Sequence, residues 1–310
     1  MIGTMITPAP PDPDSASFAY DEMAFFGENC TEYSLPVPDD YLVRRMNLGL
    51  RDGGHVSALR WGEGSPRLVF VHGGAQNAHT WDTVVLALGQ PAALCVDLPG
   101  HGHSSRRDDG RYDPRSNADS LAEVIQSEAP RAAVIVGMSL GGLSVNALAA
   151  HHADLVRRAV IIDVTPGVNR DKAKDVTDFI AGPQTFANFS EIFDRTVQFN
   201  PTRSVESLRR GILHNAHRLS DGTWEWNYDR RQLGGADPER FGDLWADVSA
   251  STCPYLLVRG ADSPVVDDDD EVELLRRRPD ARVVRVEGAG HSVQGDRPLK
   301  LAEILRAELG

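Results

Sequence analysis

The stretch AVIVGMSLGG, residues 133–142, joins an apolar run to a turn built from small residues. Its continuous apolar half predicts a parallel strand that helices cover on both faces. Its second half, GMSLG at 137–141, fits the pattern G-x-S-x-G, in which a strand turns sharply into a helix and only small residues fit beside the serine. Such a turn presents the hydroxyl of Ser139 at the start of the helix, where the amide of Leu140 can stabilise a developing oxyanion. Ser139 is therefore the candidate nucleophile.

Outward from this turn, short apolar runs rich in β-branched residues alternate with helical patterns. This alternation predicts a mostly parallel, doubly wound α/β sheet. The expected strands are Leu42–Leu50, His55–Trp61, Arg67–Val71, Ala93–Asp97, Ala133–Gly137, Ala159–Asp163, Tyr255–Arg259 and Arg282–Val286. The expected helices are Ala118–Glu128, Leu140–His152, Asp270–Arg277 and Pro298–Leu309.

One interval, residues 164–250, breaks this alternation, since it holds helical and aromatic-rich stretches but no convincing parallel strand. It predicts a helical cap inserted between the sixth and seventh strands, over the ligand crevice at the carboxyl ends of the strands. Residues 41–163 and 251–310 then form the core. Residues 1–40 are rich in Pro and Asp and predict a loosely ordered N-terminal extension.

The composition excludes several classes of protein. The 310-residue chain carries 32 Lys and Arg against 45 Asp and Glu, a formal net charge of −13, so no basic field is available to bind nucleic acid or anionic lipid. No apolar run approaches the roughly 20 residues that span a bilayer, and the N-terminus lacks a secretory signal pattern, so we expect a cytoplasmic protein with no membrane partner. Cys30, Cys95 and Cys253 have no CxxC spacing, and the acidic run 267–270 predicts a helix start, not a calcium loop.

Two further glycine-rich turns follow predicted strands. In HGG at 72–74, small residues let the chain pass close to a substrate, and the N–H of Gly74 offers a second oxyanion donor. His72 in the same turn is interpreted as a structural hydrogen-bonding residue. The turn GAGHS places His291 on a loop after the last strand, as an imidazole must be placed to reach the serine. Histidines on helical segments, His214 among them, are interpreted as surface or cap groups.

Six motifs appear in a specific order: HGG (72–74), DLPGHGHS (97–104), GMSLGG (137–142), IIDVTP (161–166), LLVRGADS (256–263) and GAGHSVQGDRP (288–298). Together they resemble the α/β-hydrolase superfamily, and the resemblance covers residues from about 42 to 310. In that family a serine attacks an acyl carbon, a histidine shuttles its proton, and an acid orients the histidine. The resemblance implies the first two roles for Ser139 and His291, and a mechanism that requires no metal or organic cofactor.

The acid departs from the commonest pattern of this family. Many members place an Asp three residues past the glycine that ends the penultimate strand, and here that position is Ser263, with Asp262 one residue early. If the strand keeps its alternation, a one-residue offset turns the Asp262 carboxylate to the other face. The alternative is Asp163, at the end of AVIID, which is similar to the acid of cap-bearing esterases with a serine at the other position. We therefore favour Asp163 over Asp262, with Ser263 as an auxiliary hydrogen-bonding partner of His291.

These residues predict a serine hydrolase that cleaves a carboxylic ester or lactone through an acyl-enzyme. A carbon–carbon bond hydrolase of ring-cleavage products uses similar parts, but such enzymes often carry Trp after the histidine, where this chain has Ser292. Cofactor-free perhydrolysis shares the same triad, and a non-catalytic ligand receptor on the same fold is an alternative from another class.

The expected partner is a small molecule, an apolar ester or lactone, because aromatic side chains in a cap over the serine would form an apolar pocket. The chain is expected to be a monomer or homodimer. The aromatic residues of the cap interval are Phe179, Phe186, Phe189, Phe193, Trp224, Trp226 and Tyr228.

Overall fold

The computed structural model describes residues 11–169, 171–200, 203–231 and 243–309. An eight-stranded sheet runs through its centre in the order β1-β2-β4-β3-β5-β6-β10-β11. Strand β2 is antiparallel to both of its neighbours, and the other pairs are parallel. The strands are β1 Val43–Gly49, β2 His55–Trp61, β3 Leu68–Val71, β4 Ala93–Val96, β5 Val134–Met138, β6 Ala159–Ile162, β10 Tyr255–Gly260 and β11 Arg282–Val286. The predicted mostly parallel α/β sheet is confirmed, and each strand lies within one residue of its expected bounds.

Helices cover both faces of the sheet because alternate residues of its central strands face two separate cores. Val69 and Ile135 pack on one face with residues of α3, α4, α8 and α9, whereas Phe70 and Val136 pack on the other with residues of α1, α2, α10 and α11. These helices are α1 Phe26–Glu32, α2 Asp82–Ala87, α3 Pro114–Glu128, α4 Leu140–His151, α8 Leu244–Ala250, α9 Asp268–Arg277, α10 Val293–Asp296 and α11 Pro298–Leu309, with short 3-10 helices η1 Ala78–Trp81 and η2 Ala153–Leu155. Within the described ranges, no helix has both the length and the apolarity to cross a membrane.

Two helices begin earlier than the apolar pattern predicted, because acidic side chains cap them. The Asp113 carboxylate accepts the first free N–H groups of α3, and Pro114 occupies the first helical position, where its missing N–H costs nothing. In α9, Asp267 and Asp270 cap each other's backbone N–H reciprocally. The interpretation of the acidic run as a helix start is therefore confirmed.

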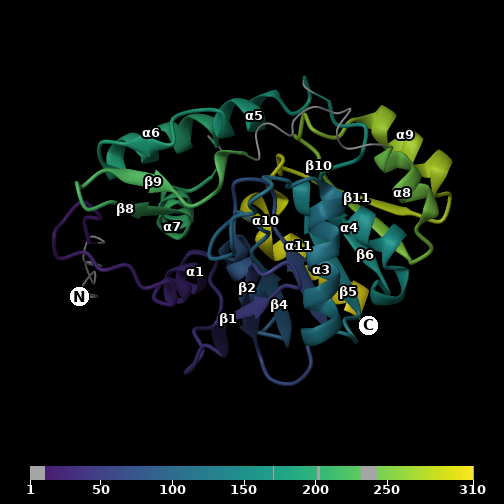
Figure 1. Ribbon diagram of the computed structural model, residues 1–310, viewed down its shortest axis with the longest axis horizontal. Helices are drawn as coiled ribbons and strands as arrows, with labels where there is room; N and C mark the ends of the chain where they lie inside the picture. Colours follow the sequence, from purple (N-terminus) through teal and green to yellow (C-terminus); the bar gives the residue numbers. More distant parts are fainter. Residues whose placement is uncertain (1–10, 170, 201–202, 232–242, 310) are drawn as a thin grey trace, which may run out of the picture.

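Between β6 and β10 the chain leaves the sheet and forms a separate layer, seen at the top of Figure 1. This layer, which we call the cap, holds α5 Lys174–Ile180, β7 Thr185–Phe186, α6 Phe189–Phe199, α7 Val205–Asn215, β8 Ala216–Arg218 and β9 Trp224–Trp226. Strands β7, β9 and β8 form a small antiparallel sheet beside the expected cap helices, and the sequence analysis did not predict these strands. Residues 232–242 of the expected cap interval lie outside the described residues.

The expected boundary between cap and core at residue 250 places α8 in the cap, but the structure places this helix beside the sheet. Its apolar residues Leu244 and Val248 are buried in the same core as Leu148 of α4, and Figure 1 shows α8 beside the sheet, not in the cap layer. The physical reason is that α8 buries its apolar face against α4. The last seven residues of the expected cap interval are therefore packed as part of the core.

The N-terminal extension was expected to be loosely ordered, but one part of it forms a packed helix. Residues 26–32 form α1, and the side chains of Phe26 and Cys30 are fully buried. The Phe26 ring packs on Trp61 of β2 and on Tyr41, with ring centroids 4.8 and 5.2 Å apart. Burying this aromatic surface outweighs the Pro/Asp-rich composition around it. Residues 1–10 of the expected extension lie outside the described residues.

Residues 11–33 of this extension also contact both layers; we call them the N-terminal segment. The Asp14 carboxylate accepts hydrogen bonds from the backbone N–H of Phe189 and from the Trp224 indole in the cap. Glu32 pairs with Arg210 of α7. On the core side, Glu22 pairs with Arg45 of β1 at 2.5 Å. The segment thus ties the cap to the sheet.

Candidate active site

Ser139 lies in a sharp turn between β5 and α4. Its φ of 51° and ψ of −120° fall in a region of backbone conformation that residues other than glycine rarely adopt. The turn is tight because a Cβ at Gly137 would lie 2.4 Å from the carbonyl oxygen of Gly141. A Cβ at Gly141 would in turn lie 2.4 Å from the carbonyl oxygens of Val71 and His72. The small residues that the sequence places around Ser139 are therefore required by close backbone approach.

Asp163 ends the neighbouring strand β6, and its side chain is fully buried. Its Oδ2 atom lies 2.8 Å from Nδ1 of His291. The same oxygen accepts a hydrogen bond of 2.5 Å from the Ser263 hydroxyl, and Oδ1 accepts one of 2.8 Å from the backbone N–H of Gly260. Three donors therefore satisfy this buried carboxylate, as a charged group without water needs.

The structure brings Asp163, and not Asp262, to the histidine. Asp262 is exposed, and its backbone N–H donates to Ala289. Ser263 also differs from the expectation, because its hydroxyl contacts the Asp163 carboxylate where the sequence suggested His291. Ser263 follows the end of β10 at Gly260, and from there its hydroxyl reaches Oδ2 of Asp163, the same oxygen that His291 contacts.

His291 has one hydrogen-bond partner within the described part of the chain, which is Asp163. Because a carboxylate oxygen accepts, we infer that Nδ1 of the ring carries the proton, which leaves Nε2 able to accept a second one. The Ser139 hydroxyl forms no hydrogen bond to the ring in these described residues. Such contacts are often long in unliganded enzymes and tighten when substrate binds.

The HGG turn is held by neutral histidines. The Nδ1–H of His72 donates to the Gly73 carbonyl at 2.7 Å, and its Nε2 accepts the backbone N–H of Leu98 at 2.9 Å. Burial lowers the pKa of His72 to about 4, which keeps the ring neutral. The structural role predicted for His72 is therefore confirmed. Nε2 of His101 accepts the N–H of Ala75 at 3.1 Å and fixes the next residue of the turn.

Two backbone donors in this region have no acceptor among the described residues. They are the N–H groups of Gly74 and Leu140, which the sequence singled out as oxyanion donors. Gly74 lies under the cap, because a Cβ there would meet Cδ1 of Ile180 at 3.6 Å. The carbonyl of the following Ala75 accepts a hydrogen bond of 2.5 Å from the Asn215 amide of α7. The cap therefore contacts the turn that carries one candidate donor.

A cavity of about 150 Å³ lies between this turn and the cap. Ala75 and Gln76, which follow Gly74, and Ser292, which follows His291, form part of its wall. Ser139 and His291 do not line it. Of the seven cap aromatics, Phe179 and Trp226 line the cavity, and most of its other lining side chains are polar. The expectation of an apolar pocket is therefore not met by this cavity.

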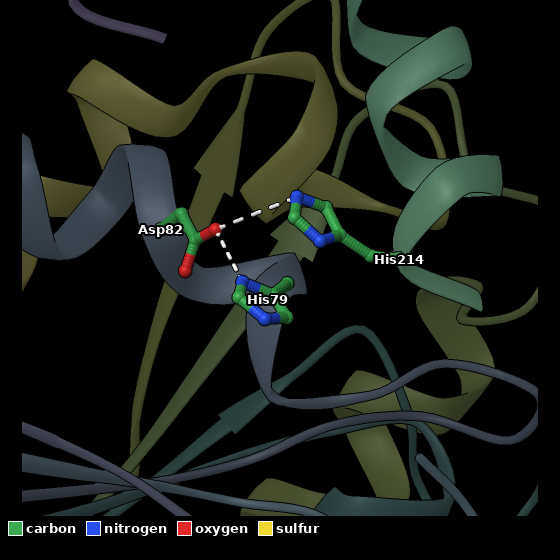
Figure 2. Close-up of side chains that lie close together, drawn as sticks. All are labelled: His79, Asp82 and His214. Atoms are coloured by element: carbon green, nitrogen blue, oxygen red, sulfur yellow. Dashed lines mark hydrogen bonds and ion pairs between the residues drawn. The ribbon is translucent and has the colours of Figure 1, made fainter. Parts of the chain in front are cut away.

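A buried polar cluster of His79, Asp82 and His214 adjoins the same cavity (Figure 2). Nδ1 of His79 lies 2.8 Å from Oδ2 of Asp82, and Nε2 lies 3.0 Å from Glu22 of the N-terminal segment. His214 comes from α7 of the cap and is buried, so of its two interpretations, surface group or cap group, the first was wrong. The i, i+3 spacing of His79 and Asp82 could have indicated their pairing, but nothing in the sequence pointed to His214.

The cluster offers one ligand atom from each residue, all within 4.8 Å, which is a donor set that a transition metal accepts. The two imidazole rings, however, are stacked, with centroids 3.8 Å apart and planes 9° from parallel. Ligands of one ion converge on it, so these rings would have to splay to coordinate a metal together. We therefore interpret the cluster as an ion-paired contact among the cap, core and N-terminal segment.

This interpretation predicts a pH-dependent stability. Burial alone would lower the pKa of His79, but the carboxylates of Asp82 and Glu22 outweigh burial and nearby Arg45 and raise that pKa to about 9. The unfolded pKa is about 6.5, so the stabilisation is complete below that pH and is lost as the pH rises through about 9. The difference in unfolding free energy between wild type and His79→Gln should shrink by roughly 3 kcal/mol from pH 6 to pH 10.

Urea denaturation at pH 6, 8 and 10 measures this difference. The control is His217→Gln, since His217 is an exposed residue of β8. Its difference from wild type should show no comparable trend. A His79→Gln difference that stays constant over this pH range would contradict the ion-paired interpretation.

Comparisons with known proteins agree with the fold described above. Residues 68–304 match the alpha/beta hydrolase family. The chain is 45% identical over 298 residues to esterase Rv0045c of Mycobacterium tuberculosis, covering 93% of this chain and 96% of that protein. It is 28% identical over 257 residues to 2-(acetamidomethylene)succinate hydrolase of Mesorhizobium japonicum, covering 82% and 90%. A solved structure of the M. tuberculosis esterase matches with a TM-score of 0.82 at 43% identity, covering 94% of this chain and 99% of that one. The chain therefore belongs to the alpha/beta hydrolase family and is a carboxylic-ester hydrolase.

Proposed function

We propose that this enzyme cleaves carboxylic esters through an acyl-enzyme formed on Ser139, with His291 as the base and Asp163 as the acid that orients it. The observation that carries this proposal is the contact of 2.8 Å between Asp163 Oδ2 and His291 Nδ1. It lies at the end of β6, next to the strand whose turn presents Ser139. Ser263 supports the proposal by binding the same carboxylate.

The proposed first step is attack of Ser139 Oγ on the acyl carbon while Nε2 of His291 takes the hydroxyl proton. The negative charge then develops on the former carbonyl oxygen, which accepts hydrogen bonds from the N–H groups of Gly74 and Leu140. Losing one such donor typically costs about 3–4 kcal/mol of transition-state stabilisation. Collapse of this intermediate breaks the ester C–O bond, and the leaving alcohol takes the proton from His291.

The second half repeats these steps with water. His291 takes a proton from the water that attacks the acyl carbon, and the carboxylic acid leaves as the Ser139 hydroxyl is restored. A lactone follows the same sequence, because it is a cyclic ester, and releases a hydroxy acid. None of these steps needs a group from outside the chain other than water.

Two measurements test this proposal together: hydrolysis of p-nitrophenyl esters with acyl chains from C2 to C12, and labelling with a fluorophosphonate followed by peptide mapping. We expect turnover of at least part of the ester series and one phosphonate adduct, located on Ser139. An adduct at another residue, or full activity after complete labelling, would overturn the proposed nucleophile. Labelling of Ser139 without turnover of any ester or lactone would overturn the proposed reaction and favour carbon–carbon cleavage.

A further inference from the structure

The cavity beside the HGG turn contains a cation without a carboxylate partner. Arg203, just before α7, lines this cavity, and within the described ranges no carboxylate oxygen lies within 4.0 Å of its guanidinium group. Nη2 donates to the Ser207 hydroxyl at 2.7 Å, and Nε is buried with no hydrogen-bond partner. By contrast, Arg210 of the same cavity pairs with Glu32. Arg203 is therefore a partly satisfied charge in a polar cavity.

The charges around Arg203 do not neutralise it. Burial lowers the pKa of the guanidinium from its usual value, and the more distant carboxylates of Asp296 and Glu32 offset this only in part. An arginine nevertheless stays protonated in proteins. The carboxylate of Asp296 forms no ion pair with Arg203 within 4.0 Å, and its Oδ2 accepts the N–H of Gly290 at 2.9 Å. A buried charge left in this state is costly, and an anion from outside the chain would relieve the cost.

The other charged groups of the cavity wall are already paired. Arg210 is matched by Glu32, and His79 lies between Asp82 and Glu22. Among the described charged residues of the wall, Arg203 is the one without an ion pair within 4.0 Å.

Arg203 also lies against the segment that follows His291. A Cβ at Gly295 would lie 2.8 Å from Cζ of Arg203, and both residues line the cavity. The wall also includes Ala75, next to the candidate oxyanion donor Gly74. The cavity therefore adjoins Arg203 and the residues that directly follow Gly74 and His291.

We propose that Arg203 binds a carboxylate of the substrate, so that the preferred substrates are monoesters of dicarboxylic acids. This inference rests on the proposed function and adds the substrate class. The planar carboxylate matches the donors of the guanidinium fork. A neutral ester of the same length would leave the guanidinium unpaired and would bind less well. Phe179 and Trp226 then contact the methylene chain between the two ends.

Three ethyl esters with six-carbon acyl chains test this preference: monoethyl adipate, ethyl hexanoate, and the amide of monoethyl adipate as a neutral polar control. We expect wild-type kcat/KM for monoethyl adipate to exceed that for either neutral ester by at least about tenfold, mainly through KM. In Arg203→Gln this ratio should fall close to 1, and Arg203→Lys should keep part of it. Arg209→Gln is the matched control, because Arg209 contacts Glu28 and Pro11 and does not line the cavity.

A thermal shift measures the same site without turnover. Adipate, as the diacid product, should raise the Tm of wild type and of Arg209→Gln, but not that of Arg203→Gln. Inorganic phosphate at the same concentration distinguishes a carboxylate site from a general anion site, and an equal shift with phosphate would overturn the assignment to carboxylates. Ser139-dependent hydrolysis of ethyl hexanoate with no preference for monoethyl adipate would overturn this inference while the proposed function stands. Absence of any ester turnover would overturn the proposed function, and the adipate shift would still report on Arg203.

Discussion

Replacement of Ser139 by alanine is expected to lower kcat/KM for ester hydrolysis by at least about 10⁴-fold, because the acyl-enzyme can no longer form. The residual rate would come from substrate binding and the two oxyanion donors. The variant should also resist fluorophosphonate labelling. The turn itself should persist, because alanine differs from serine only by the hydroxyl and the neighbouring glycines still permit the close approach of the chain. The measurement is the initial rate of hydrolysis of p-nitrophenyl esters. The variant should be expressed and purified on columns that have never held wild type, because traces of wild type would dominate so low a rate.

Ser144→Ala is the matched control for this variant. Ser144 is a buried serine one turn further along α4, and its hydroxyl donates to the carbonyl of Leu140 at 2.8 Å. Losing that hydrogen bond should cost about 1 kcal/mol of stability and leave kcat/KM within a few-fold of wild type. Activity of Ser139→Ala above about 1% of wild type, in a preparation free of wild type, would exclude Ser139 as the nucleophile.

Replacement of Asp163 by asparagine is expected to lower kcat/KM by about 10³–10⁴-fold. The carboxylate accepts from Nδ1 of His291, and an amide at this position can instead present its NH₂ group and favour the wrong tautomer of the ring. Asparagine is the suitable replacement because Asp163 has a φ of 49°, a conformation that asparagine tolerates better than alanine does. The loss should appear in kcat with little change in KM.

Asp262→Asn provides the comparison that decides between the two candidate acids. Asp262 is exposed, so this variant should keep kcat/KM within about twofold of wild type and unfold at the same temperature. The reverse outcome, with Asp262→Asn inactive and Asp163→Asn active, would assign the acid to the position that the structure leaves in solvent. Circular dichroism on both variants separates a loss of catalysis from a loss of fold.

The strands of the sheet could be predicted because each one is marked by an apolar pattern within a few consecutive residues. Runs such as LVFV in β3 and AVII in β6 are apolar throughout, and both of their faces are covered. The turn at Ser139 could be predicted as well, because glycines two residues before and after the serine indicate that the backbone there packs closely against neighbouring backbone. The contact of Asp163 with His291 was favoured by counting positions past the strand ends. Each of these inferences needed only residues that are neighbours in the chain or follow the same sheet edge.

The missed features depend on partners that lie far apart in the sequence. Helix α1 has only seven residues and no N-cap side chain, so its burial follows from packing on core residues such as Trp61 and not from a local signal. The strands of the cap have two or three residues each, too short for an alternating pattern. The sequence could not single out Arg203, because the absence of a carboxylate within ion-pair distance depends on the tertiary structure.

The path of the N-terminal segment sets the order in which the chain can complete its fold. Phe25 packs against His214 at 5.2 Å between ring centroids, and Asp14 binds partners 175 and 210 residues later in the chain. At the usual 5–20 residues per second, a ribosome needs roughly 10–40 s to make those partners after the segment has emerged. The Phe25 side chain therefore remains without its partner His214 while the strands of the sheet are synthesised. Docking of this segment is accordingly a late event of high contact order, and chaperones that bind exposed aromatic residues have that interval in which to act.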